Sequence, residues 1–539
     1  MIYKEGSDPV SRKKKEALQG IIYVLPSFIL IMAFCIIPIF MSGYFSFTSY
    51  NIMTPPKFVG LENYEKVFQD GYVADAAKNT LLYVLMTVPA QTILSLVFAA
   101  FLAYKMQNKT GGFLRSVMFI PVIASAVTAG TIWRIILNTE GGLLNNILNF
   151  FHLDSVNWLG SAKTALISIC IVAVWKNVGY FLVIYYAGIM GISKDLYEAA
   201  KVDGATSIQQ FFKITLPMLK PITYLVVTLG IIWSFQVFDL AYLMTGGGPG
   251  RATVTLVMGI YNAAFKQYKM GYACAMAMLL LLIVVIINVI EICFSRKGRE
   301  SSMAGMSATN TKKQKAWTPL GVIGLFFILI FAAICIAPFL YMLIMSFTHS
   351  TTLMISWGDV NFTDFTNYEH VFGKSGFFRS LMNSVIVVGC SCFFNCVIAS
   401  MAAYGFEKKH FWGKEFLFKV YMLTLMIPGQ VTMIPVFIIM KKLGLLNTYF
   451  ALVVIILNAF GVFLIRQFME SVPDELLEAA KVDGCPEYKI FINIVIPLIK
   501  PVLVSLVVFT FVTSWNDFMW PLVSTTDSSM YTLTVHCHC

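Results

Sequence analysis

Charged residues are scarce in this sequence. Only 12% of its 539 residues are Asp, Glu, Lys or Arg, whereas soluble proteins average about 25%. Hydrophobic residues make up 58% of the chain, and one aqueous core cannot hide that much apolar surface. A soluble globular protein is therefore excluded. The predicted fold class is all-α, a polytopic bundle of membrane helices.

Several site motifs are also missing. No Gly-x-x-x-x-Gly-Lys-Ser/Thr phosphate loop occurs, and the glycine-rich stretch 245–250 has no lysine. Most of the 11 Cys lie inside apolar runs, which excludes a secreted disulfide framework. The net charge of +11 comes from residues between apolar runs that form no basic face, so nucleic acid is not an expected partner. The chain itself is predicted to be no enzyme and to hold no cofactor or metal.

Apolar runs long enough to cross a bilayer as helices recur along the chain. If the N-terminus is cytoplasmic, the dense basic runs 12–15, 296–299 and 312–315 all fall in inside segments, as the positive-inside rule requires. Eleven spans are expected, at residues 20–42, 80–104, 116–137, 164–190, 221–244, 271–294, 319–346, 381–405, 418–440, 448–468 and 501–522.

A polar, low-complexity segment at 298–316 is predicted to be a cytoplasmic linker between a first unit, 1–297, with six spans and a second unit, 317–539, with five. Its two methionines precede a basic stretch and a span, as at the start of a second protein. A natural fusion and a merged pair of reading frames are both open. The second unit is expected to lack its last helix, and the final residues His-Cys-His-Cys are read as a truncated end rather than as a metal tail, because adjacent ligands with no fold around them make a poor site.

One internal repeat organises the chain. The seven residues 198–204, Glu-Ala-Ala-Lys-Val-Asp-Gly, recur 280 residues later at 478–484, and Pro217 and Pro497 follow in step. Each copy lies between the fourth and fifth spans of its half, so the chain is a tandem parallel duplication.

Each copy predicts a short helix in the loop. Asp195 is expected to cap the first helix with Glu198 as its capping-box acid, and Gly204 and Gly484 are expected to end the helices in the left-handed conformation. The prolines would then turn the chain back into the membrane. A capped connector explains one such loop, whereas two identical exposed copies favour a docking site for a partner present twice.

The loop resembles a known signature. Glu-Ala-Ala, three residues, Gly, nine residues, Ile-x-Leu-Pro is typical of ATP-binding-cassette importer permeases, and the first copy fits it completely, while Ile496 replaces the Leu in the second. Nearly the whole chain resembles carbohydrate permease subunits of the maltose and glycerol-phosphate type. The resemblance implies docking of an ATPase on Glu198, Ala199, Ala200, Gly204, Glu478, Ala479, Ala480 and Gly484.

The resemblance also implies the partners. They are two copies of a cytoplasmic ATPase subunit that binds ATP and Mg, an extracytoplasmic solute-binding protein, membrane lipid and a small-molecule solute that passes by alternating access. The expected location is the bacterial cytoplasmic membrane, with the N-terminus inside.

Polar and aromatic residues within the spans are candidates for the solute pathway. At the 280-residue offset, Phe235-Gln236 aligns with Trp515-Asn516, and an aromatic beside an amide suits a sugar. Lys176 is expected to pair with Asp239 or to contact an anionic solute. Interhelical hydrogen bonds are the alternative role for all of these residues. The candidates are Lys176, Asn177, Tyr180, Phe235, Gln236, Asp239, Asn458, Trp515, Asn516 and Asp517.

Composition and spacing leave the solute open. An importer of glycerol 3-phosphate is one alternative, and an ion-coupled secondary transporter with duplicated halves is another. An ion-coupled transporter is expected to have ionisable residues at the membrane midplane in both halves, and Lys176 has no charged counterpart in the second half.

Overall fold

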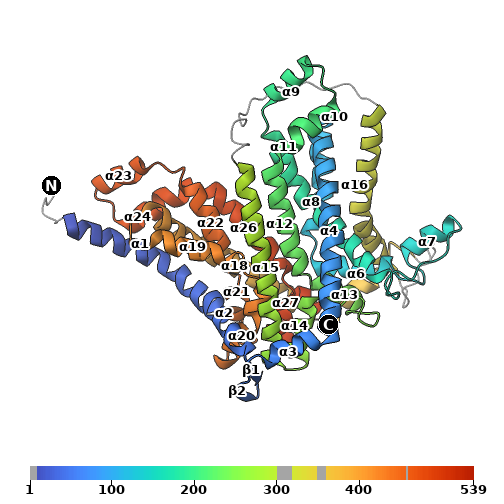
Figure 1. Cartoon of the computed structure of the whole chain (residues 1–539), viewed down its shortest axis with the longest axis horizontal. Coiled ribbons are helices and arrows are strands. Elements are labelled where there is room, and N and C mark those ends of the chain that lie inside the picture. The colour runs from blue at the N-terminus through green and yellow to red at the C-terminus, as the bar shows by residue number, and fades with distance from the viewer. Residues whose placement is uncertain (1–8, 300–318, 349–359, 375, 457–458, 539) are drawn as a thin grey trace. The chain divides into compact units, whose positions relative to one another are not determined.

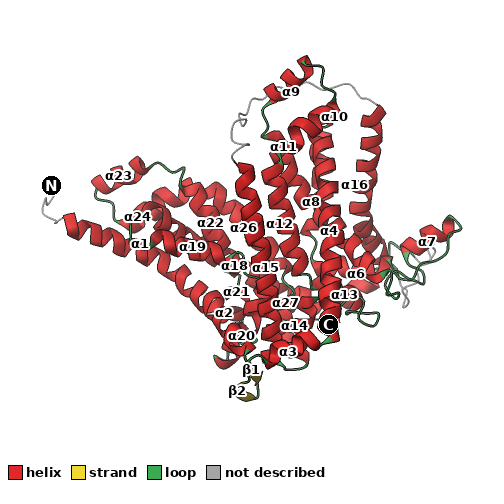
Figure 2. Ribbon diagram, viewed as in Figure 1, coloured by secondary structure: helices red, strands yellow, loops and turns green. Residues whose placement is uncertain are grey.

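The computed structural model describes residues 9–299, 319–348, 360–374, 376–456 and 459–538. Over these ranges the chain is almost entirely helical, apart from an antiparallel hairpin of β1 (Thr48–Asn51) and β2 (Thr54–Phe58) (Figure 2). The predicted all-α architecture is confirmed. The expected linker lies outside the described residues from residue 300 onward.

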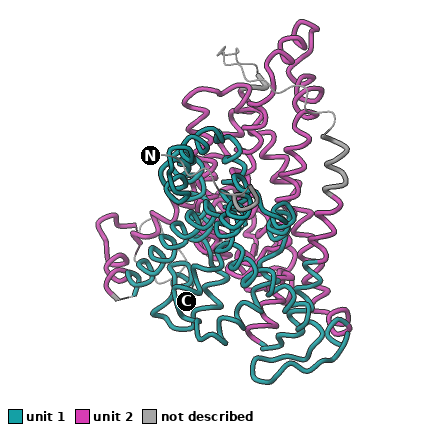
Figure 3. The backbone as a smooth tube through the Cα atoms, turned by 90° about the vertical axis from the view of Figure 1, so that its left-hand side faces the viewer, with its two compact units in different colours: residues 1–64, 267–281, 376–539 teal, residues 65–266, 282–375 magenta. Residues whose placement is uncertain are grey.

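The described chain forms two compact units that interleave in sequence (Figure 3). Unit 1 contains residues 1–64, 267–281 and 376–539, and unit 2 contains residues 65–266 and 282–375. Each unit therefore combines helices from both halves of the sequence. The long helix α15 (Met270–Arg299) and the short α3 (Glu62–Gln69) have residues in both.

In unit 1, the N-terminal helix α1 (Pro9–Ile31) packs along α18 (Phe377–Lys408). Glycines permit this approach, because a Cβ on Gly405 would lie 2.9 Å from the Gly20 carbonyl oxygen. The Tyr23 and Tyr404 rings meet edge to face beside them, 5.0 Å apart. The other elements of unit 1 are α2 (Ile37–Ser46), α19 (Lys414–Thr424), α20 (Gly429–Lys442), α21 (Tyr449–Val454), α22 (Ala459–Met469), α23 (Asp474–Val482), α24 (Glu487–Ile490), α25 (Ile496–Leu498), α26 (Lys500–Asn516), α27 (Met519–Ser524) and α28 (Leu533–His536).

In unit 2, α4 (Gly71–Lys105), α8 (Ala165–Met190) and α12 (Lys220–Phe235) run side by side (Figure 1). The helix that opens the second half of the sequence, α16 (Pro319–Met345), packs on this bundle, and the Trp175 indole N–H donates to the Ile334 carbonyl at 3.0 Å. The other elements of unit 2 are α5 (Lys109–Ile123), α6 (Ala126–Ile136), α7 (Leu143–Phe150), α9 (Lys194–Val202), α10 (Ser207–Gln210), α11 (Leu216–Met218), α13 (Asp239–Thr245), α14 (Leu256–Tyr261) and α17 (Thr366–Lys374).

Two expected spans are bent sharply. The run 116–137 is divided into α5 and α6, at 96°, and the run 418–440 into α19 and α20, at 98°. The Ser125 hydroxyl caps the new helix in the first case by accepting from the Thr128 N–H at 3.0 Å, and Pro428 precedes the new helix in the second. Within the described ranges, six helices are long and apolar enough to span a membrane, or up to ten if each bent pair is one span, against the eleven expected.

Both fifth spans contain a short non-helical break. α12 gives way to α13 at residues 236–238, and α26 gives way to α27 at residues 517–518. A threonine from further along the chain closes each break: the Thr255 hydroxyl donates to the Val237 carbonyl at 2.9 Å, and the Thr534 hydroxyl donates to the Asp517 carbonyl at 2.8 Å. The duplication seen in the sequence thus extends to matched interruptions of the helices.

Candidate functional site

The first Glu-Ala-Ala loop forms the short helix α9. Its N-cap is Ser193, whose hydroxyl accepts from the Asp195 N–H at 3.3 Å, so the expected cap at Asp195 is wrong by two residues. A serine hydroxyl satisfies a terminal N–H as well as a carboxylate does. Gly204 ends the helix at φ +79°, and the Ala205 N–H donates to the Ala200 carbonyl at 2.8 Å. The left-handed ending predicted for this glycine is confirmed.

The second loop repeats this geometry in α23. The helix begins after Pro473 and ends at Gly484, with φ +77°, and the Cys485 N–H donates to the Ala480 carbonyl at 3.0 Å. A Cβ on Gly204 or Gly484 would meet no atom within 4 Å. Glycine is therefore favoured at both positions by the backbone conformation and not by crowding.

A second helical stretch follows each glycine and turns toward the next span. Each stretch contains a π-helical turn, Phe211–Thr215 in the first copy and Phe491–Val495 in the second. The axis then bends by 68° into α12 and by 77° into α26. Pro217 and Pro497 lie at these bends, as the sequence predicts.

The two loops expose the same positions. Glu198, Ala199, Glu478 and Ala479 are exposed, while Ala200 is half-buried and Ala480 is buried. Large apolar side chains beside them are also exposed, most of all Val202 at 88% and Val482 at 69%. Sequence reasoning missed these apolar positions, although the 280-residue offset pairs them. The exposed pairs are Leu196 with Leu476, Val202 with Val482, Ile208 with Tyr488, and Phe212 with Ile492.

The first loop is attached to unit 2 by neutral hydroxyl groups. The Tyr104 hydroxyl, at the end of α4, is hydrogen-bonded to the Thr215 hydroxyl and donates to Tyr197 in α9 at 3.3 Å. The Tyr197 and Thr215 hydroxyls lie 2.9 Å apart. This triangle ties α9 and the π-helical turn to the end of a long span.

The second loop is attached to unit 1 by a buried charge pair. Lys409, only 1% exposed, forms an ion pair with Glu487 in α24, and the Tyr404 hydroxyl donates to the same carboxylate oxygen. Burial alone would raise the pKa of Glu487, but the hydrogen bonds from Lys409 and Tyr404 and the lysine charge outweigh it and hold that pKa below its usual range. A second lysine, Lys408, donates to the Val472 carbonyl just before α23, at 2.7 Å.

Lys176 lies on α8, and its side chain reaches the bend between α5 and α6. Its ammonium group donates to the Ala124 carbonyl at 2.6 Å and to the Pro121 and Val122 carbonyls at 3.4 Å. These carbonyls belong to the C-terminal end of α5, where the helix dipole favours a cation. Asp239 interacts with this ammonium electrostatically. Lys176 thus donates mainly to backbone carbonyls that have no partner within a helix because α5 ends at the bend.

The other candidates in unit 2 lie around the α12–α13 break and on the neighbouring helix α8. Gln236 is the first non-helical residue and Asp239 starts α13, while Phe235 is buried. The Asn177 amide donates to Gln91 on α4 at 3.4 Å, and the Tyr180 ring lies 5.1 Å from that of Trp233. Sequence reasoning missed Gln91, a buried polar residue inside an apolar run.

In unit 1, the candidates lie at the equivalent break. Asn516 ends α26 and Asp517 follows it, while the Trp515 ring stacks on that of Phe511 at 5.6 Å. All three are half-buried. Asn458 lies outside the described residues. The described candidates that border the breaks are thus Phe235, Gln236 and Asp239 in unit 2 and Trp515, Asn516 and Asp517 in unit 1.

Two amide clamps repeat between the halves and were also missed. Asn79 on α4 donates to the Arg251 and Val254 carbonyls at 2.8 and 3.1 Å. Asn383 on α18 donates to the Ser529 and Tyr531 carbonyls at 2.9 and 3.0 Å. The sequence held a related signal, since 63–68 and 367–372 share Asn-Tyr-Glu-x-Val-Phe. In each of these segments the Asn side chain donates to two backbone carbonyls at the end of the preceding long helix or just after it, those of residues 46 and 48 in the first half and of residues 346 and 348 in the second.

A family model agrees with these repeats. The model described as "Binding-protein-dependent transport system inner membrane component" matches residues 71–299 and again residues 396–536. The chain belongs to this family. It is therefore a multi-pass membrane permease, and the family is a component of transport systems and not of enzymes, as the sequence predicts.

Individual relatives cover about half of the chain each. A probable ABC transporter permease protein of Bacillus subtilis, YurN, is 36% identical over 52% of this chain and 96% of its own length. The sulfoquinovosyl glycerol transport system permease protein SmoG of Agrobacterium fabrum is 34% identical over 49% of this chain and 86% of its own. The trehalose/maltose transport system permease protein MalF of Thermococcus litoralis is 34% identical over 48% and 86%. The permease fold is thus matched by proteins about half as long.

A solved structure shows weaker similarity. The crystal structure of a bacterial ABC transporter involved in the import of the acidic polysaccharide alginate has a TM-score of 0.49 and 22% identity, over 54% of this chain and 99% of that chain. Similarity of this size carries no argument about the solute. Among the residues that the structure describes, no group of three or more His, Cys, Asp or Glu side chains could hold a metal ion.

Proposed function

We propose that this chain is the membrane-spanning part of an ATP-driven, binding-protein-dependent importer whose solute is a sugar or sugar-like molecule. The observation that carries the proposal is the pair of Glu-Ala-Ala loops, which share a backbone conformation and expose the same apolar positions. A partner present in two identical copies would find the same surface twice. Because the sequence has no phosphate loop, that partner supplies the ATP and Mg sites.

The docking surface of each loop consists of the acid, the two alanines and the glycine, with the exposed valine at the end of the helix. Small alanines let another surface approach closely, and the valine gives it apolar area to cover. The surface comprises Glu198, Ala199, Ala200, Val202 and Gly204 in the first copy, and Glu478, Ala479, Val482 and Gly484 in the second, with the buried Ala480 beneath them.

The helix breaks are proposed to line the solute pathway. Non-helical backbone at membrane depth is tolerated where it is buried in protein or lines a water-filled cavity. Gln236 and Asn516 bring an amide to each break, and each amide offers a donor and an acceptor to a hydroxyl-rich solute. Several relatives are named as permeases for sugars, including trehalose/maltose and multiple sugars. Since the Lys176 ammonium group is engaged by backbone carbonyls, a neutral solute is favoured over an anionic one.

Membership of the family supports the remaining parts of the proposal. A solute-binding protein would deliver the solute from outside the cytoplasmic membrane of a bacterium, and the N-terminus would be cytoplasmic, where the basic residues of the inside loops fall. Alternating access would be driven by closure of the docked ATPase subunits.

Association with the ATPase tests the docking loops. The double variant Gly204→Asp with Gly484→Asp adds a charged side chain at a left-handed position on both loops, and we expect co-purification of the ATPase with the tagged chain to be lost. Gly444→Asp is the matched control, because Gly444 also has φ +67°, is exposed and would hold a Cβ with no other atom within 4 Å. Undiminished co-purification of the double variant, with normal membrane insertion, would refute the docking role.

Uptake tests the pathway separately. Gln236→Leu with Asn516→Leu should lower ATP-dependent uptake of radiolabelled maltose or trehalose into vesicles while leaving ATPase association intact. Uptake of glycerol 3-phosphate in place of either sugar would contradict the solute class but not the docking loops. Uptake that persists when the ATPase is omitted would contradict the importer class altogether.

A further inference from the structure

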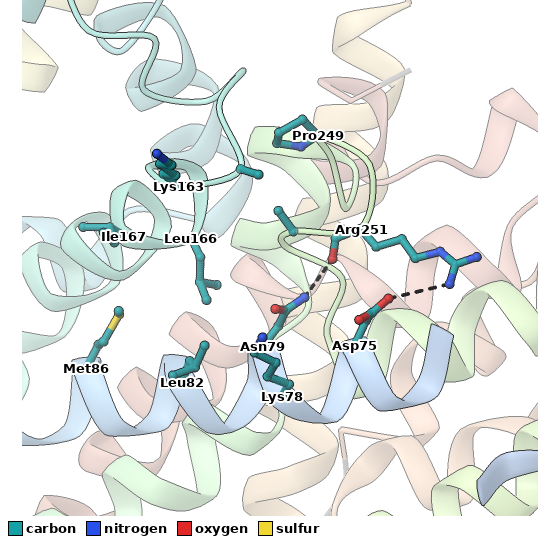
Figure 4. A pocket seen from close by; sticks show the side chains of 12 residues that line it. Asp75, Lys78, Asn79, Leu82, Met86, Lys163, Leu166, Ile167, Pro249 and Arg251 are labelled. Carbon is teal, nitrogen blue, oxygen red and sulfur yellow. Dashed lines mark hydrogen bonds and ion pairs between the residues drawn. The ribbon is translucent and has the colours of Figure 1, made fainter. Parts of the chain in front are cut away.

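A charged pocket opens between two helices of unit 2, away from the docking loop. It has a volume of about 470 Å³ and lies among the first turns of α4, the start of α8 and the loop at residues 249–252 (Figure 4). Three basic residues line it, Lys78, Lys163 and Arg251, and Asp75 is the one acid among its lining residues. Figure 4 shows Lys163 across the pocket from Arg251. The pocket therefore carries a net positive charge.

Apolar side chains also line the same pocket. Leu82 and Met86 follow Lys78 at intervals of four residues along α4, and Leu166 and Ile167 follow Lys163 on α8. Further apolar side chains on these two helices are exposed beyond the pocket, including Leu85, Ile93 and Ile171. Exposed apolar stripes on membrane-spanning helices face lipid tails. The basic residues thus stand where each span begins, above a surface suited to acyl chains.

The position of Arg251 is fixed by the surrounding structure. Its backbone carbonyl accepts from the Asn79 amide, and its guanidinium lies 3.6 Å from the Asp75 carboxylate and 5.6 Å from the centre of the Tyr72 ring. Asp75 offsets one of the three positive charges, so two remain for a ligand. The N-terminus of α8, a helix of 26 residues, adds its positive dipole end beside Lys163.

The second half of the chain shows that the fold does not need these charges. Its amide clamp at Asn383 is built in the same way, yet Met382 stands where the first half has Lys78, and Ser529 where it has Arg251. Arg379 replaces Asp75 and donates to the Ser529 carbonyl at 3.0 Å. Because the clamp forms without the two basic residues, their presence in the first half calls for another explanation.

We propose that this pocket binds the headgroup of an anionic phospholipid of the phosphatidylglycerol type. The phosphate would lie among Lys78, Lys163 and Arg251, and an acyl chain would lie along Leu82, Met86 and Ile167. Lysine and arginine side chains form strong, charge-assisted hydrogen bonds with phosphate oxygens. The opposite end of α8 leads into the first docking loop, about 39 Å away along the helix. The bound lipid therefore belongs to the leaflet on the far side of the membrane from the docking surface.

Native mass spectrometry of the purified transporter with its ATPase subunits tests the site. Phosphatidylglycerol and phosphatidylcholine of the same acyl composition are titrated onto the complex. The wild type should bind one phosphatidylglycerol in preference to phosphatidylcholine. Lys78→Met with Arg251→Ser installs the residues of the second half, and we expect it to weaken phosphatidylglycerol binding about 30-fold, as the loss of two surface charges facing an anionic lipid predicts.

The matched control is Lys57→Met with Lys269→Ser, which removes the same charge from exposed residues that do not line the pocket. An equal loss in this control, or unchanged binding in the pocket variant, would overturn the proposal. Inorganic phosphate is titrated in parallel. If phosphate alone displaced the lipid at equal concentration, the site would be for a free anion and the lipid assignment would be wrong. Lys163→Gln, which alters a single exposed side chain, repeats the test should the double variant fold poorly.

Discussion

The two Glu-Ala-Ala loops have the same exposed surface but are attached to their units by different chemistry. In the first loop three neutral hydroxyls, from Tyr104, Tyr197 and Thr215, hold the helix to the end of α4. In the second loop, the buried ion pair between Lys409, just after α18, and Glu487 holds α24 to the end of α18. The backbone of both loops nevertheless ends in the same left-handed glycine.

The exposed surface of each loop is therefore independent of the contacts that attach the loop to its unit. Any interaction that fixes the loop suffices for attachment, so hydroxyls and charges can replace one another there. The exposed face of each loop has to bind the same partner, so both loops carry the same alanines, valine and glycine. The comparison predicts that variants of the attachments act unequally in the two loops, whereas variants of the surface act equally.

The largest effect is expected for Lys409→Met. Removing the ammonium group leaves the Glu487 carboxylate, only 14% exposed, without its ion-pair partner, and breaking a buried pair in this way costs about 3–5 kcal/mol. The apparent melting temperature in detergent should fall, and trypsin should cut the second loop faster than the first. Lys105→Met is the control, since Lys105 holds the corresponding place at the end of α4. Equal melting temperatures for the two variants would show that the buried pair does not stabilise the second loop.

A smaller effect is expected for Val202→Asp and Val482→Asp. Covering an exposed valine on binding contributes about 1.5–3 kcal/mol, so each variant should bind the ATPase at least about tenfold more weakly. The two effects should be similar because the surfaces match. Leu443→Asp, at an exposed apolar residue after α20, should leave binding unchanged. A strong effect in one loop and none in the other would mean that the partner does not use the copies alike.

Much of this arrangement could be predicted from the sequence, and its limits have physical causes. Apolar length located the six unbroken spans of the described chain but not the sharp bends of others, and the repeat predicted the left-handed conformation of Gly204 and Gly484. The pairing of α1 with α18 could not be predicted, because hydrophobic runs do not tell which helix a face will cover. The contacts of Lys176 could not be foreseen either, since its partners are backbone carbonyls released by a bend. The repeated Asn-Tyr-Glu segment was visible in the sequence, and its meaning emerged only with the hydrogen bonds of its asparagines.

Tyr104→Phe should affect the first loop modestly. It removes one hydroxyl from a neutral network while the Tyr197 and Thr215 hydroxyls still face each other, and a neutral hydrogen bond contributes about 1 kcal/mol. Amide hydrogen exchange in α9 should rise slightly, with α23 unchanged. Faster exchange in α23 as well would mean that the loops are not held independently.

The last and smallest contrast is in pH dependence. The hydrogen bonds and charge of Lys409 lower the pKa of Glu487 in the folded state, so the stability from this carboxylate is present above the ordinary glutamate pKa of about 4.3 and is lost as the pH falls through the lowered value. The hydroxyl network of the first loop has no group that titrates in this window. The protection of the α24 amides, measured relative to their intrinsic exchange rates, should therefore fall on acidification below that range, while the protection of the α10 amides should stay constant. Glu487→Gln should abolish this loss of protection, because an amide keeps the shape of the carboxylate but has no proton to gain. A pH response that survived in this variant would place the titrating group elsewhere in unit 1 and remove the basis for the difference between the two attachments.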